Sequence, residues 1–278
     1  MIKTNVKTNI FISVFFLFIG FSVMEGYLCK FYSDPRHLAE IDDKNYLPNY
    51  CIDIFKNYWS ENGIIEYLQV VLLILAIYFL FSSRIFFYDN KKSIYYLIII
   101  KIIGLTYFLG EEISWGQHIF KWASPDFFID SNNQKETNLH NISNLFDQLP
   151  RTIVLLWCCF SIIIIKYVNK FVKINKMLYI FINPNLKVFL ISLLLIFFVL
   201  PDFIVDYLGL HPGYGNNSYE FAILALEKGL FSNSMPKSIF YDVITFNFLR
   251  LSELHELIFA FYFFIHSYLL KKKTQTIF

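Results

Sequence analysis

The stretch from Ile94 to His118 reads IYYLIIIKIIGLTYFLGEEISWGQH, and it decides how this chain folds. It is almost entirely apolar up to Leu109, and polar residues then gather at its end. A helix needs about 20 mostly apolar residues to cross the roughly 30 Å of membrane hydrocarbon. We therefore expect residues 94–118 to form a membrane-spanning helix whose last turns carry chemistry.

Five further stretches have the same apolar character, at about 9–28, 63–82, 152–169, 186–208 and 249–270. The composition agrees, because 56% of the residues are hydrophobic and 20% are aromatic, which leaves too little polar surface for a soluble domain. We predict an all-α polytopic membrane protein with about six transmembrane helices, forming a single integral membrane domain over residues 1–278. Pro201 is expected to kink the fifth span.

Basic residues set the expected orientation, since Lys and Arg in short loops favour the cytoplasmic side. They fall before the first span, between the second and third, between the fourth and fifth, and after the sixth (Lys3, Lys7; Arg84, Lys91, Lys92; Lys166, Lys170, Lys173, Lys176, Lys187; Lys271, Lys272, Lys273). This alternation predicts that both termini are cytoplasmic and that long outer loops cover about 29–62, 119–150 and 209–248. Lys101 is expected to snorkel to the inner side.

The same distribution bears on compartment and partners. Since the basic residues are used at the cytoplasmic rim, we expect the lipid bilayer as a partner and no nucleic acid. The first stretch is expected to be a retained span, because no small-x-small cleavage site follows it. Cys29 and Cys51 fall in the first outer loop, where either a disulfide or two free thiols would be compatible with the sequence.

The polar end of the third span is the sharpest local signal. At about 100° per residue, Glu111, Ser114, Trp115 and His118 would share one helix face, with Glu112 beside them. Two adjacent carboxylates at membrane depth are costly, so one should share a proton, accept several hydrogen bonds or bind a cation. The alternative is that the pair lies in interfacial water, with Trp115 as a membrane anchor.

Further polar residues are expected near this end. The loop NQKETNLHN, residues 133–141, supplies amides and His140, which would either fold back over the site or cap the fourth helix. Acids also lie toward the outer ends of other spans, and we assign four of them to a hydrated, outward-open cavity (Glu66, Asp202, Glu253, Glu256).

The two motifs together, EEISWGQ at 111–117 and the later NLHN at 138–141, resemble a family of uncharacterised bacterial multi-span membrane proteins. The resemblance covers most of the chain and implies a bacterial inner membrane, in which the orientation expected from the basic residues turns the site outward, but it brings no activity. A fainter similarity, through Ser114, Trp115 and His118, is to the alkaline-ceramidase-like membrane hydrolases.

Three functions follow from these patterns and stay open at this point. The first is a metal-dependent or acid/base hydrolase or transferase acting on a lipid or a lipid-linked envelope substrate. Glu111, Glu112, His118 and His140 would be its catalytic groups or the ligands of Zn²⁺, Mn²⁺ or Mg²⁺. The residues expected to bind substrate are the polar neighbours and the four acids (Ser114, Trp115, Gln117, Asn138, Asn141, Glu66, Asp202, Glu253, Glu256). The alternatives are a cation- or proton-coupled transporter and a non-catalytic membrane assembly subunit.

Overall fold

The computed structural model describes residues 3–32, 63–131, 137–139, 142, 152–158, 160–161, 167–168, 170–171, 175–182, 187–207 and 251–276. All the regular elements in these ranges are helices, which confirms the all-α class. The chain divides into two compact units, one of residues 1–64 with 197–255 and the other of residues 65–196 with 256–278. The single integral membrane domain stays a prediction.

The first unit contains the helix α1 (Lys3–Tyr32). Its buried side chains Ile12, Phe15 and Ile19 recur at helical spacing, whereas Val14 and Leu17 on the other side are exposed. A helix in water would carry polar residues on its exposed face. The apolar exposed face of α1 is the pattern of a helix that contacts lipid.

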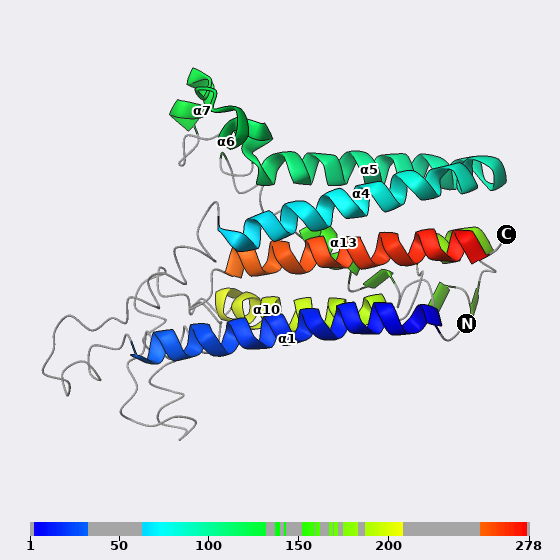
Figure 1. Ribbon diagram of the computed structural model, residues 1–278, viewed down its shortest axis with the longest axis horizontal. Helices are drawn as coiled ribbons and strands as arrows, with labels where there is room; N and C mark the ends of the chain where they lie inside the picture. The colour runs from blue at the N-terminus through cyan, green and yellow to red at the C-terminus, as the bar shows by residue number, and fades with distance from the viewer. Residues whose placement is uncertain are drawn as a thin grey trace, which may run out of the picture. The chain divides into compact units, whose positions relative to one another are not determined.

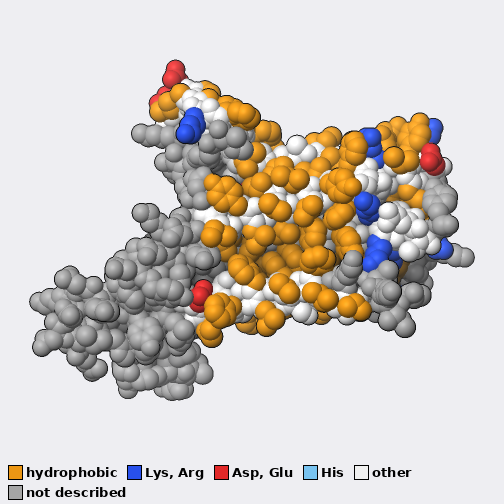
Figure 2. Space-filling model, in the orientation of Figure 1, with side chains coloured by type: hydrophobic (Ala, Val, Ile, Leu, Met, Phe, Trp, Pro, Cys, Tyr) orange, Lys and Arg blue, Asp and Glu red, His pale blue; other side chains and the backbone are white. Residues whose placement is uncertain are grey.

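The second unit begins with two long helices joined by a very short turn (Figure 1). They are α4 (Ile64–Asn90) and α5 (Lys92–Glu112). The turn is closed by the Lys91 N–H, which donates to the Phe87 carbonyl at 2.7 Å. The rings of Tyr88 and Tyr95 also meet across it, with centroids 5.2 Å apart. Figure 2 shows Lys and Arg side chains gathered near this end of the unit.

The helix α13 (Leu251–Thr276) is buried on all sides from Leu257 to Ile265. Within the second unit, the Phe79 ring of α4 lies 6.0 Å from Phe264 and 5.5 Å from Tyr268. A helix that is apolar all round belongs in the interior of a bundle. This part of α13 is therefore a core helix of its unit.

Two more described helices are α9 (Lys176–Ile182) and α10 (Lys187–Tyr207), with Pro201 inside α10. The second unit includes α9 and the part of α10 up to residue 196. Within the second unit, the Ser192 hydroxyl donates to the carbonyl of Cys158 at 2.6 Å. This bond joins α10 to the helical residues 152–158 of the predicted fourth span.

Three described helices are long and apolar enough to cross a membrane: Thr8–Gly26, Ile64–Asp89 and Lys92–Glu112. A fourth is added if α9 and α10, which are bent by 41°, form one broken span. In the most apolar stretch of each of the three, only 28%, 33% and 22% of the residues are buried, so most of their apolar surface is exposed. This supports a membrane protein, while the number of six spans, the orientation and the positions of the termini stay predictions.

Two boundaries differ from the expected ones. The helix α5 ends at Glu112 instead of continuing to His118. The helix α9 lies where the sequence predicted an inner turn, and the sequence Asn183-Pro184-Asn185, rich in turn formers, separates it from α10. Hydropathy missed α9 because a seven-residue helix is too short to register as a span.

Candidate functional site

The chain reverses its handedness immediately after α5. Ser114, Trp115 and Gly116 form a single turn with φ of 45°, 54° and 91°. Left-handed backbone costs about 1–2 kcal/mol for each residue that carries a Cβ, so other contacts must hold this turn. The prediction that one helix face carries Glu111, Ser114, Trp115 and His118 is therefore wrong, because the helix ends at Glu112. His118 instead belongs to the separate short helix α6 (Gln117–Phe120).

The carboxylate of Glu111 holds the left-handed turn. This side chain is only 4% exposed. Its Oε1 accepts the indole N–H of Trp115 at 2.8 Å, and its Oε2 accepts the backbone N–H of Leu139 at 2.7 Å. A side-chain hydrogen bond also joins Tyr107 to it. Of the three outcomes expected for the Glu pair, Glu111 shows the second, since it accepts several hydrogen bonds.

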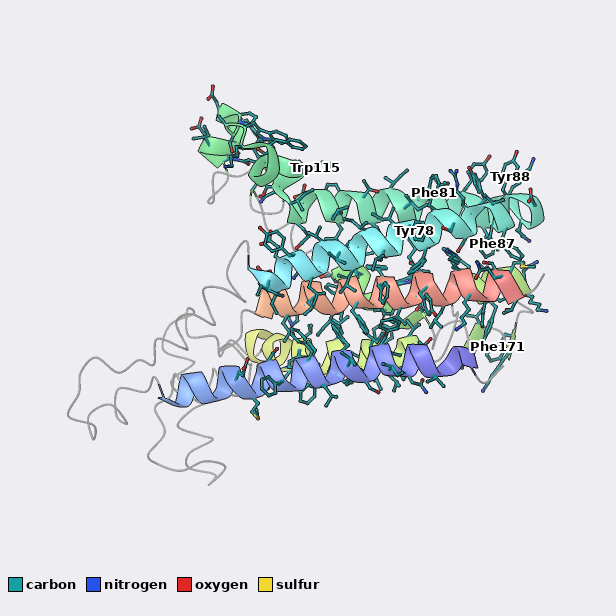
Figure 3. The ribbon with its side chains drawn as sticks, viewed as in Figure 1. Tyr78, Phe81, Phe87, Tyr88, Trp115 and Phe171 are labelled. Atoms are coloured by element: carbon teal, nitrogen blue, oxygen red, sulfur yellow. The ribbon has the colours of Figure 1, made fainter. Side chains whose placement is uncertain are left out.

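The ring of Trp115 lies against the backbone of Gly110. A Cβ at residue 110 would come within 2.9 Å of three ring carbons of Trp115, so only glycine fits there. The ring also meets Tyr107 edge to face, with centroids 6.0 Å apart. Trp115 nevertheless remains 44% exposed, at the end of α5 (Figure 3). It therefore joins the buried carboxylate to the molecular surface.

Further hydrogen bonds bring the second motif against the first. The amide of Gln117 donates to the Ser124 hydroxyl at 2.7 Å and accepts the N–H of Thr137 at 2.7 Å. The buried Ser114 hydroxyl accepts the Asn138 amide N–H at 3.3 Å. We call these residues the polar network (Tyr107, Glu111, Ser114, Trp115, Gln117, Ser124, Thr137, Asn138, Leu139).

The network shows that residues 137–139 lie back against the end of α5, which is one of the two positions expected for this loop. Sequence reasoning gave no role to four residues of the network, Tyr107, Ser124, Thr137 and Leu139, or to Gly110, which lies against the Trp115 ring. Two of them carried a signal: Tyr107 stands one helical turn before Glu111, and Gly110 directly precedes the Glu pair. Ser124 and Thr137 carried none, because nothing in their local sequence distinguishes them.

The other predicted site residues lie elsewhere or outside the described part of the chain. Glu112 is half-buried at the end of α5, and Glu66 is half-buried in the first turn of α4. Glu253 and Glu256 are buried near the start of α13. The side chains of His118, Asp202 and Cys29, and all of Cys51, His140 and Asn141, lie outside the described residues. The convergence of these groups on one outward cavity stays a prediction.

The described residues do not decide whether the expected metal site exists. Among them, no group of three or more His, Cys, Asp and Glu side chains is arranged to hold a metal ion. Two of the four predicted ligands, His118 and His140, have no described side chain. The metal site therefore also stays a prediction.

A second polar contact lies within the helices of the second unit. The Lys101 Nζ of α5 is 3.0 Å from the Nδ1 of His266 in α13, which is fully buried. The Lys101 ammonium is also 5.3 Å from the ring centroid of Phe263 and 5.9 Å from that of Phe181. Lys101 was expected to snorkel to the membrane surface, but it turns inward, because His266 offers a hydrogen-bond acceptor and two aromatic faces attract its charge.

Comparison with protein-family models, curated proteins and solved structures finds no match. The resemblance seen in the two motifs stays a prediction. The geometry of the polar network is therefore the observation that bears on function.

Proposed function

We propose that this protein is an integral membrane enzyme, a hydrolase or transferase acting on a lipid or lipid-linked envelope substrate where the outer end of α5 meets water. The observation that carries the proposal is the carboxylate of Glu111, which binds Trp115 and Leu139 and so joins two motifs at the end of a candidate span. A protein that needed only to end a helix would not require this connection.

Glu111 and Glu112 take different roles in this proposal. Both oxygens of Glu111 already accept hydrogen bonds, so Glu111 positions the surrounding chain. Glu112, which is half-buried next to it, is the group we assign to acid/base chemistry. With one carboxylate held by hydrogen bonds and the other exchanging a proton, the two adjacent groups do not both have to be ionised during the reaction.

The two histidines come directly after anchored residues in the sequence. His118 follows Gln117, whose amide binds Ser124 and Thr137, and His140 follows Leu139, whose N–H binds Glu111. We assign both to proton transfer with Glu112. Carboxylate and imidazole groups also suit Zn²⁺ or Mn²⁺, which would supply a polarised water if one were bound.

The strain in the turn supports a functional role. Ser114 and Trp115 both adopt positive φ without being glycine. Such backbone persists only where the surroundings hold it, and it is concentrated at functional sites. The turn also leaves Trp115 partly exposed beside the buried carboxylate, which is suited to a substrate with both an apolar and a polar part.

Lipid turnover by the full-length protein tests this proposal. The protein in nanodiscs would be incubated with a bacterial polar-lipid extract, and the products would be identified by mass spectrometry. We expect turnover that Glu112→Gln and His140→Ala reduce at least 100-fold, while Asp126→Asn, an exposed acid outside the network, retains it. Elemental analysis of the same samples would report any bound metal. Absence of turnover by folded wild type, or equal turnover by Glu112→Gln, would overturn the proposal.

A second candidate function is proton-coupled transport, and the pair of Lys101 and His266 supports it. Ionisable groups paired inside membrane helices often mark proton pathways. Proteoliposomes containing a trapped pH-sensitive dye would test this candidate. It requires a proton flux, in the presence of the co-transported solute, that Lys101→Met abolishes, and vesicles of wild-type protein that stay proton-tight when bacterial metabolite extract is added would count against it.

A further inference from the structure

The segment after the left-handed turn presents apolar side chains to its surroundings. Phe120 is 73% exposed, Trp122 41%, Phe127 62% and Ile129 42%. The rings of Phe120 and Trp122 stack with centroids 5.8 Å apart and planes within 8°. Figure 2 shows hydrophobic side chains over this part of the second unit, and we call residues 120–131 the apolar arm.

The arm ends in an amphipathic helical turn, α7 (Asp126–Ser131). At about 100° per residue, Phe127, Phe128 and Ile129 spread over about 200° of the turn, and Phe128 lies opposite the midpoint between Asp126 and Asp130, which are about 40° apart. The carbonyl of Pro125 fixes its start by accepting the N–H groups of Phe128 and Ile129 at 2.9 and 3.1 Å. An apolar side opposite charged residues is the pattern of a helix that lies at a membrane surface.

The arm is attached close to the end of a membrane span and to the polar network. The candidate span ends at Glu112, eight residues before the arm begins. Gln117 binds Ser124 within the arm and Thr137 after it, so a single amide group anchors the chain on both sides of α7. Figure 1 shows α6 and α7 extending from the end of α5.

We infer that the apolar arm lies in the headgroup–acyl boundary of the bilayer and contacts lipid through Phe127 and Ile129. Lipid is the occupant that fits, because the arm continues from a span end and aromatic side chains prefer this boundary. Asp126 and Asp130 would then face water. That the arm also brings lipid to the Glu112 site rests on the proposed function, whereas the contact itself does not.

Collision measurements with nitroxide labels would test the contact in the full-length protein in nanodiscs. Single labels would be placed by Phe127→Cys and Ile129→Cys, with Asp126→Cys and Asp130→Cys as matched controls in the same turn. Labelled wild type would give the background from native cysteines. We expect the ratio of oxygen to nickel-chelate accessibility to be at least threefold higher at 127 and 129 than at 126 and 130. Equal ratios at all four positions would overturn the inference.

Fluorescence supplies a second measurement should a cysteine variant fail to fold. Brominated lipids in the nanodisc should quench wild-type emission more than that of Trp122→Phe, and water-soluble acrylamide should quench the Trp122 contribution weakly. The reverse order would also contradict the lipid contact.

Turnover separates this inference from the proposed function. Ile129→Asp should lower turnover of bilayer lipids at least tenfold while leaving turnover of a short-chain, water-soluble lipid nearly unchanged. If the wild-type protein is inactive but the arm lies deep in the bilayer, the proposed enzyme function is wrong and the inferred lipid contact stands. If the protein is active but the arm is exposed to water, the proposed function stands and the inferred lipid contact is wrong.

Discussion

Replacing Glu111 by Gln should release residues 137–139 from the end of α5. In the structure, Oε1 accepts the Trp115 indole N–H at 2.8 Å and Oε2 accepts the Leu139 N–H at 2.7 Å. Glutamine keeps one acceptor oxygen and puts an NH₂ group in place of the other. Whichever way the amide turns, an N–H then faces another N–H.

The magnitude follows from the bonds that change. Losing one charge-assisted hydrogen bond at a buried site costs about 1.5–3 kcal/mol, and converting the other to a neutral bond costs about 1 kcal/mol more. The docking of residues 137–139 should therefore weaken by about 2.5–4 kcal/mol, which corresponds to a roughly 60- to 700-fold increase in local opening. The helices of the bundle should stay folded, because the bonds affected lie at the end of the span.

Hydrogen exchange with mass spectrometry on the protein in nanodiscs would measure this opening in a peptide covering residues 137–142. Glu112→Gln is the matched control, because it removes the neighbouring charge without touching either bond, and we expect less than a threefold change. Unchanged exchange in Glu111→Gln would refute the reasoning, as would an equal increase in both variants. The first result would mean that the network does not depend on the carboxylate charge, and the second that general charge loss is responsible.

Three further predictions follow from other contacts. Gly110→Ala should destabilise the turn by about 1–3 kcal/mol by displacing the Trp115 ring, and it should cost little more once Trp115→Ala is present, as exchange of residues 137–139 would show. Lys121→Gly should stabilise the end of α6 by about 0.5–1 kcal/mol, because Lys121 has a φ of 55° without being glycine, and slower exchange of residues 117–122 would confirm it. Lys101→Met should lower the stability by about 1–3 kcal/mol, because it leaves the Nδ1 of buried His266 without its donor. The Lys101→Met, His266→Leu double variant should lose less than the sum of the single changes in thermal unfolding, and additive losses would show that the pair is not coupled.

Sequence alone located the long helices. The stretches predicted at 63–82 and 249–270 correspond to α4 (Ile64–Asn90) and α13 (Leu251–Thr276). These positions could be predicted because a long apolar run is a property of the local sequence alone. The sequence also indicated that the motifs at 111–117 and 138–141 belong together, and their described residues do meet.

The end of α5 could not be predicted in the same way. Nothing local forbids residues 113–118 from being helical, since Gly116 is the only strong helix breaker among them. Two hydrogen bonds hold the left-handed turn, one from the Trp115 indole N–H to Glu111 and one from the Asn138 amide to the Ser114 hydroxyl. The second bond joins residues 24 positions apart. A pattern read along one helix cannot include such a partner.

Charged side chains show most clearly which features the sequence predicts and which only the tertiary structure decides. The sequence placed Lys101 in a span and two carboxylates at the end of that span, because residue type and position are properties of the chain itself. Only the tertiary structure decided that Lys101 contacts His266, which is 165 positions away. It also decided that Glu111 accepts a hydrogen bond from the backbone N–H of Leu139, which is 28 positions away. A buried charge takes its role from the donors and acceptors within about 3 Å of it, and folding, not sequence order, brings those atoms together.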